Sequence, residues 1–154
     1  MGRIYDVTMT ATSFSAADRD LVQVTSQSTK VTKLLSCKVT QSNRYGDANA
    51  AGQVIQIVRA ATTGSGGGTT LTARPKSPGD SAFGGSITAG FTTAAATPTV
   101  LVEEGTNLQA GFHWTPTEKC EIEIAPSGII AIRYTGTPAA ATTFTVQLEL
   151  EELG

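Results

Sequence analysis

The stretch TFTVQLELE at residues 143–151 alternates strictly between polar and apolar side chains. Phe144, Val146, Leu148 and Leu150 therefore share one face of an extended chain, because successive side chains of a β-strand point to opposite sides. The opposite face carries threonine, glutamine and glutamate. This pattern predicts a strand with one face in a hydrophobic core and the other exposed to solvent or to a neighbouring subunit.

The same period of two recurs along the chain. Tyr5, Val7 and Met9 lie on one side of a predicted first strand. A long strand is predicted over residues 31–39, with Leu34 on one face and these residues on the other: Val31, Lys33, Leu35, Cys37 and Val39. Further strands are predicted near residues 20–25, 54–58, 98–103, 109–114, 121–124 and 130–134. Residues 54–58 (VIQIV) are apolar on both sides, which is typical of a central strand covered on both faces.

These elements predict an all-β fold. Threonine, valine and isoleucine are abundant and favour pleated structure, whereas glycine and proline fall mostly between the strands. About eight or nine short strands joined by turns indicate an antiparallel β-sandwich or jelly roll, with a small barrel as the other arrangement. Helical turns are conceivable only at residues 15–20 and 49–52. The 154 residues suit a single domain over 1–154.

Composition excludes several classes of protein. A hydrophobic fraction of 40% and a net charge of -2 argue against a disordered chain and against a nucleic-acid partner. No apolar run reaches the roughly 20 residues that span a bilayer, and the N-terminus lacks a signal-peptide core. We expect synthesis in a cytoplasm, no membrane partner, and Cys37 and Cys120 as buried free thiols rather than a disulfide.

Charge is distributed unevenly. Residues 1–60 contain seven Lys and Arg against four Asp, and residues 61–154 contain four against nine Asp and Glu. Solvated faces explain this pattern adequately. The alternative is that oppositely charged faces of neighbouring copies meet.

Residues 60–98 interrupt the alternation. The segment is rich in glycine, alanine, threonine and serine, and contains GSGGG at 64–68 and RPKSPGD at 74–80. Loops this long are usually functional or flexible. We predict one or two long loops, with a short strand near Ser86–Thr92, that either move freely or reach a neighbouring subunit and gain their order there.

The sequence offers no catalytic or metal-binding set. His113 is the single histidine and lies between Phe112 and Trp114, where a structural role is expected. The glycine run at 64–68 lacks the Lys-Ser/Thr ending of a phosphate-binding loop. Neighbouring glutamates at 103–104 and 151–152 point to opposite faces of a strand and do not form an acid–base pair. We predict a protein that is not an enzyme and needs no cofactor or metal.

An ordered series of short motifs resembles a group of small proteins from tailed bacteriophages and marine viral sequences. The series runs from TQS at 40–42 and GDA at 46–48, through TTGSGG at 62–67 and PKSPGD at 75–80, to NLQAG at 107–111 and WTP at 114–116. The resemblance is clearest over residues 40–116, and the chain departs from it near Gly84-Gly85. Small β proteins of this kind resemble capsid decoration, or cement, proteins.

The resemblance implies a structural virion protein on the outer face of a capsid. Its expected partners are the major capsid protein and further copies of itself, as a homotrimer, with no direct contact to nucleic acid. A tail or head–tail component is the alternative within the virion, and a carbohydrate-binding or host-adhesion module is the alternative of another class. Interface energy concentrates in a few large or charged groups, so the candidate interface residues are Tyr45, Arg74, Lys76, Asp80 and Phe83.

Overall fold

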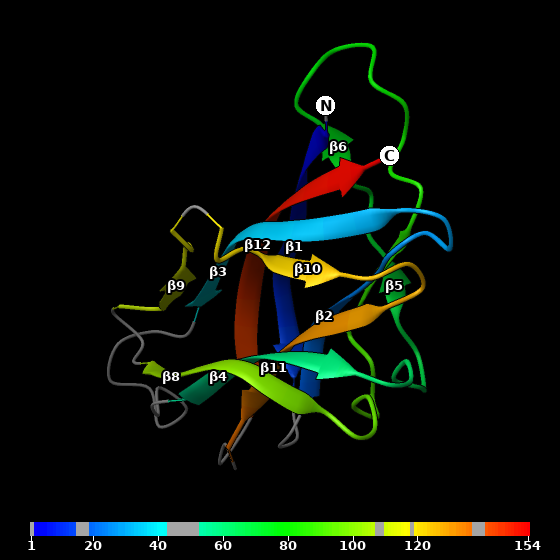
Figure 1. Ribbon diagram of the computed structural model, residues 1–154. Coiled ribbons are helices and arrows are strands. Elements are labelled where there is room, and N and C mark those ends of the chain that lie inside the picture. Colours follow the sequence, from blue (N-terminus) through cyan, green and yellow to red (C-terminus); the bar gives the residue numbers. More distant parts are fainter. Residues whose placement is uncertain (1, 15–18, 43–52, 107–109, 118, 137–140) are drawn as a thin grey trace.

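Two antiparallel sheets pack face to face as a β-sandwich in the computed structural model (Figure 1). The structure describes residues 2–14, 19–42, 53–106, 110–117, 119–136 and 141–154. These residues contain no helix, and so none long and apolar enough to cross a membrane. The predicted all-β class and the sandwich arrangement are confirmed. Of the helical turns considered at 15–20 and 49–52, residues 15–18 and 49–52 lie outside the described residues, whereas residues 19–20 belong to a β-strand.

Each sheet contains six described strands. Sheet A has the order β10-β3-β12-β1-β6, with β9 also paired to β3. Its strands are β1 (Arg3–Phe14), β3 (Val31–Gln41), β6 (Arg74–Pro75), β9 (Phe112–Trp114), β10 (Ile122–Ile124) and β12 (Thr142–Leu153). Sheet B has the order β5-β7-β2-β11-β4-β8. Its strands are β2 (Arg19–Thr25), β4 (Gln53–Ala60), β5 (Thr69–Thr70), β7 (Ser86–Ala89), β8 (Thr99–Thr106) and β11 (Ile129–Thr135).

The described strands number twelve rather than eight or nine. The difference comes from short pieces, because β5 and β6 have two residues each. Neither is long enough to produce a visible alternation in the sequence.

β12 lies at the centre of sheet A, between β1 and β3. Phe144, Val146, Leu148 and Leu150 are all buried, as the alternation predicts. Glu151 and Glu152 point to opposite faces, and Glu152 is the buried member of the pair.

The predicted face of β3 is wrong in its first half. Leu34 is fully buried in the core, whereas Lys33 faces outward and forms an ion pair with Glu123. The pairing of β3 with β12 shifts by one residue at Leu35, so that Cys37 and Val39 return to the core. A β-bulge of this kind reverses the alternation, and a single sequence gives no warning of it.

The strand that is buried on both faces is β11 rather than residues 54–58. All residues of β11 from Ile129 to Tyr134 are buried. Ile130, Ile132 and Tyr134 face the main core, whereas Ile129 packs on the outer side of sheet B with Ala60 and Ala95. The outer side of sheet B is therefore covered by residues from segment 60–98.

The two cysteines differ in environment. Cys37 is buried, and burial raises the pKa of its thiol. Cys120 is exposed, which contradicts the expectation that both thiols are buried. Both are free thiols, as predicted.

Val146→Asp is expected to destabilise the protein severely, by about 4 kcal/mol or more, because it buries an unpaired carboxylate at the centre of sheet A. Urea unfolding followed by circular dichroism measures the loss. Gln147→Asp is the matched control, since Gln147 is the exposed neighbour on the same strand, and it should stay within about 0.5 kcal/mol of wild type. Equal stability of the two variants would contradict the assigned faces of β12.

Candidate interaction surfaces

Segment 60–98 is ordered by contacts within its own chain. It contributes β5 and β7 to sheet B and β6 to sheet A, so it joins both sheets along one side of the sandwich. The short strand expected near Ser86–Thr92 is present as β7. The predictions that the segment moves freely, or gains its order only from a neighbouring subunit, are therefore wrong.

A buried ion pair holds the last part of this segment against sheet B. Asp20 is 0% exposed and Arg133 is 7% exposed. Arg133 Nε donates to Asp20 Oδ1 over 2.6 Å. The other carboxylate oxygen accepts from the backbone N–H of Ala95 over 2.7 Å, and Arg133 Nη2 donates to the Ala95 carbonyl over 2.8 Å. Both backbone groups of Ala95 are thus bound to the two charged side chains.

A bulge in β2 produces this alignment. The register between β2 and β11 shifts at Leu21, which places Asp20 directly opposite Arg133. Gln23, on the same strand, donates to Asp20 Oδ2 over 2.7 Å and accepts from the N–H of Gly64 over 3.1 Å. The two ends of segment 60–98 are therefore fixed to neighbouring polar side chains on the outer side of sheet B.

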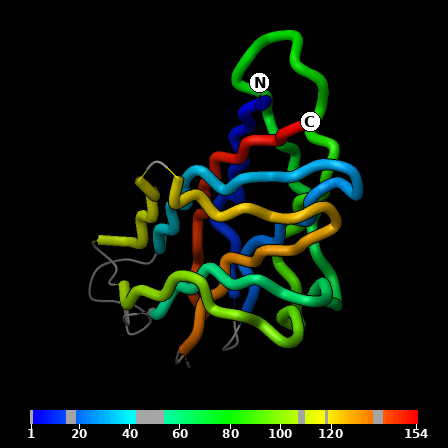
Figure 2. Tube along the Cα trace, viewed as in Figure 1, coloured from blue at the N-terminus to red at the C-terminus, as the bar shows by residue number. Residues whose placement is uncertain are grey.

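The middle of the segment forms a loop, residues 76–83, that projects beyond the end of the sandwich where both chain termini lie (Figures 1 and 2). Tyr5 anchors its far end, because its hydroxyl donates to the Ser81 carbonyl over 3.0 Å and its ring packs edge-on against Phe83 with centroids 5.4 Å apart. Arg3 donates to the Ser81 hydroxyl over 2.7 Å. The N–H of Gly84 donates to the buried Glu152 carboxylate over 2.9 Å.

Lys76 anchors the near end of the same loop. Its ammonium group lies 2.8 Å from Glu149 Oε1 and 3.5 Å from Asp6 Oδ1. The hydrogen bond to Glu149 is the main cause of a raised Lys76 pKa. The tip between these anchors is a turn in which Asp80 N–H donates to the Ser77 carbonyl over 3.2 Å. Gly79 occupies a position with φ of +95°, where a side chain would be strained.

Four of the five predicted interface residues lie on β6 and this loop. Arg74 is exposed on β6. The side chains of Lys76 and Phe83 contact residues of sheet A, whereas Asp80 lies at the tip of the loop. Tyr45 lies outside the described residues. The structure therefore gathers Arg74, Lys76, Asp80 and Phe83 on one projecting feature.

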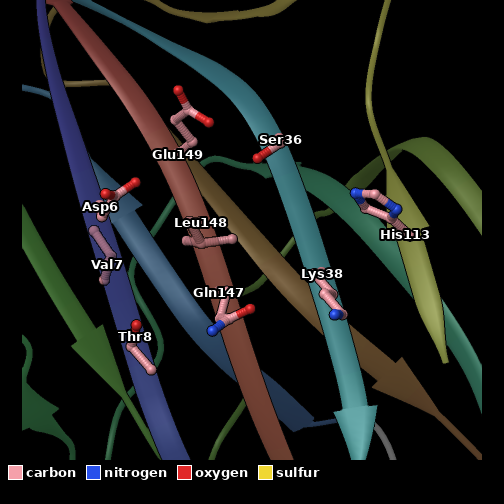
Figure 3. A pocket seen from close by; sticks show the side chains of 9 residues that line it. All are labelled: Asp6, Val7, Thr8, Ser36, Lys38, His113, Gln147, Leu148 and Glu149. Carbon is pink, nitrogen blue, oxygen red and sulfur yellow. The ribbon is translucent and has the colours of Figure 1, made fainter. Parts of the chain in front are cut away.

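The outer face of sheet A is a second polar surface. A shallow depression of about 390 Å³ lies across four strands (Figure 3). Its lining residues are Asp6, Val7, Thr8, Ser36, Lys38, His113, Gln147, Leu148 and Glu149. His113 is exposed at the rim, with its Nε2 atom 3.2 Å from the Thr115 hydroxyl. Phe112 on the same strand is buried, as the alternation predicts.

The ion pairs of the fold leave the charge asymmetry of the sequence unchanged, because two pair a base of residues 1–60 with an acid of residues 61–154 and two pair the reverse. Four ion pairs among the described residues join residues 1–60 to residues 61–154. They are Lys30–Glu152, Lys33–Glu123, Asp6–Lys76 and Asp20–Arg133. Because the two halves of the sequence alternate within both sheets, they do not form two oppositely charged faces.

Comparison with known protein families, curated proteins and solved structures finds no match to this chain. Within the described part of the chain, no group of three or more His, Cys, Asp or Glu side chains is arranged to hold a metal ion.

The buried ion pair of Asp20 and Arg133 was not predicted from the sequence. The sequence signal for this pair was a charged residue, Asp20, at the start of one apolar strand and a second, Arg133, inside another.

Asp20→Ala is expected to destabilise the protein by about 3–5 kcal/mol, because it leaves the buried Arg133 guanidinium without its anion. The double variant Asp20→Ala, Arg133→Met should recover much of this loss, since the unpaired charge is also removed. A double-mutant cycle from urea unfolding measures the coupling. Additive losses at the two positions would contradict the assigned ion pair.

Proposed function

We propose that this chain is a structural virion protein that decorates the outer face of a tailed-phage capsid and stabilises the shell. The observation that supports this proposal best is the fixed loop 76–83, which projects from the end of a rigid sandwich and is anchored on both sides by its own chain. A loop that is ordered before binding loses little conformational entropy on contact with a partner. Such a loop suits attachment to a repeated surface.

The proposed mechanism is mechanical. A protein that binds the assembled shell, and not its separated subunits, shifts the equilibrium towards the shell by mass action. Each copy needs one well-ordered surface that contacts the shell and a folded β-sandwich that holds this surface in place. We expect the major capsid protein as partner and a homotrimer as the decorating unit.

Arg74 and Asp80 are the charged residues that would make the contact. Arg74 is exposed on β6, and no ion pair or hydrogen bond is formed by either side chain among the described residues. Lys76 and Phe83 would act by holding the loop in position. The proposed contact is therefore electrostatic, through Arg74 on β6 and Asp80 at the loop tip, and intrachain packing of Lys76 and Phe83 supports it.

A carbohydrate-binding or host-adhesion module is the second candidate function. The depression on the outer face of sheet A favours it, because hydroxyl, amide and carboxylate groups there could bind the hydroxyls of a sugar. His113 contributes the one ring among the residues that line it. Sugar recognition usually also uses an exposed aromatic platform, and Phe83 is packed against Tyr5 instead.

The test uses shells assembled from the major capsid protein of the same genome, prepared without this chain. The wild-type protein should bind them saturably in a co-sedimentation assay, and Arg74→Glu should weaken binding about tenfold through like-charge repulsion or loss of an ion pair. Glu104→Lys is the control, because Glu104 is also exposed but lies on β8 at the far edge of sheet B. Absence of saturable binding by the wild-type protein would contradict the proposed function.

A further inference from the structure

The free edge of β1 is largely unpaired. β1 has twelve residues, but its outer neighbour β6 pairs only with Tyr5 and Asp6. The N–H of Lys76 donates to the Ile4 carbonyl over 2.9 Å, so the backbone groups of even-numbered residues face this edge up to the bulge that follows Met9. By the same alternation, the N–H and C=O of Thr8 point away from β12. No described strand pairs with them.

Both long edges have a bulge, but residues 7–14 of β1 lack the charges that protect β8. β8 has a bulge at Leu101 and two exposed glutamates, Glu103 and Glu104. Residues 7–14 of β1 (VTMTATSF) contain no charge and no proline, and are interrupted by one bulge between Met9 and Thr12. Charges, prolines and short lengths are the usual devices that prevent strand addition at an edge. Their absence from residues 7–14 leaves this edge open to another strand.

A groove runs along the same edge. Its volume is about 640 Å³, and β1 forms one wall while residues 70–75 form the other. The lining residues are Asp6, Thr8, Thr10, Thr70, Leu71, Thr72, Arg74 and Pro75. A separate, smaller hollow of about 130 Å³ lies beside Thr12, Ser13 and Phe14 at the end of β1. The groove arises because the chain crosses from sheet B at β5 to sheet A at β6 and pairs with β1 only at Tyr5 and Asp6.

We infer that this groove receives an extended, uncharged segment of the shell protein, which adds to sheet A as a strand beside β1. This inference rests on the proposed function and names the mode of attachment. Main-chain hydrogen bonds to Thr8 and its neighbours provide affinity, and threonine side chains on both walls favour small or hydroxylated residues in the added strand. Arg74 and Asp6 lie at one end of the groove, which suits a polar terminus of that segment.

A second copy of this chain fits the groove less well. Residues 70–75 line the groove opposite β1, so a pair of β1 strands from two copies would have to accommodate two such walls. A flexible segment of another polypeptide has no such wall and can enter the groove between β1 and residues 70–75. The groove therefore favours an arm from a different polypeptide.

Hydrogen–deuterium exchange of the wild-type protein, free and bound to shells, tests this assignment without a mutation. Amides in peptides covering residues 7–14 should exchange at least about tenfold more slowly on attachment. Peptides covering β8 (Thr99–Thr106) are the internal control and should not change. Unchanged exchange at 7–14 in bound protein would overturn the inference while leaving the proposed function intact.

The substitution Thr8→Pro provides a second test of the inference. Proline is tolerated on an edge strand but removes the N–H that the added strand would use, so shell affinity should fall about tenfold or more. Thr8→Ala loses the side chain but keeps that N–H, so it should lose less shell affinity than Thr8→Pro. Equal binding by Thr8→Pro and Thr8→Ala would overturn the inference. Slowed exchange at 7–14 in self-associated protein without shells would place a second copy in the groove and overturn it too. Failure of the wild-type protein to bind shells would instead remove the proposed function and this inference with it.

Discussion

Asp20 and Arg133 are charged side chains with almost no exposure, and together they bind both backbone groups of Ala95. A buried ion pair of this kind is costly to form unless hydrogen bonds satisfy the remaining polar atoms. Here Ala95 and Gln23 supply those bonds. The pair therefore requires segment 60–98 to lie over the outer side of sheet B, and that requirement determines how the rest of the segment crosses between the sheets.

The path of segment 60–98 creates both proposed contact features. Because its two ends are fixed on sheet B, its middle must reach sheet A to form β6 and must then return through the loop 76–83. Tyr5, Lys76 and Glu152 hold that loop at its base. The same excursion separates residues 70–75 from β1 and leaves the groove beside Thr8. Segment 60–98 is thus ordered by contacts with both sheets, although it is rich in small residues.

Strict alternation predicted the core faces of β1 and β12 correctly, because Val7, Met9, Val146 and Leu148 sit on strands that pair without a shift at those residues. It failed where a bulge changes the register, as at Leu35 in β3. It also failed for segment 60–98, whose order depends on tertiary contacts at Asp20 and Arg133 that local pattern does not encode. Sequence analysis identified four candidate residues as the large or charged groups within a segment of small residues: Arg74, Lys76, Asp80 and Phe83. Their placement on one loop required the structure.

We propose that this protein is a fixed part of a virion shell. Electron cryomicroscopy of the intact particle tests it most directly, because a two-sheet sandwich of this size has a recognisable shape at moderate resolution. The account predicts density for the sandwich on the outer face of the capsid, with loop 76–83 and the free edge of β1 directed towards the shell. Particles without that density on the capsid, or density confined to the tail, would contradict it.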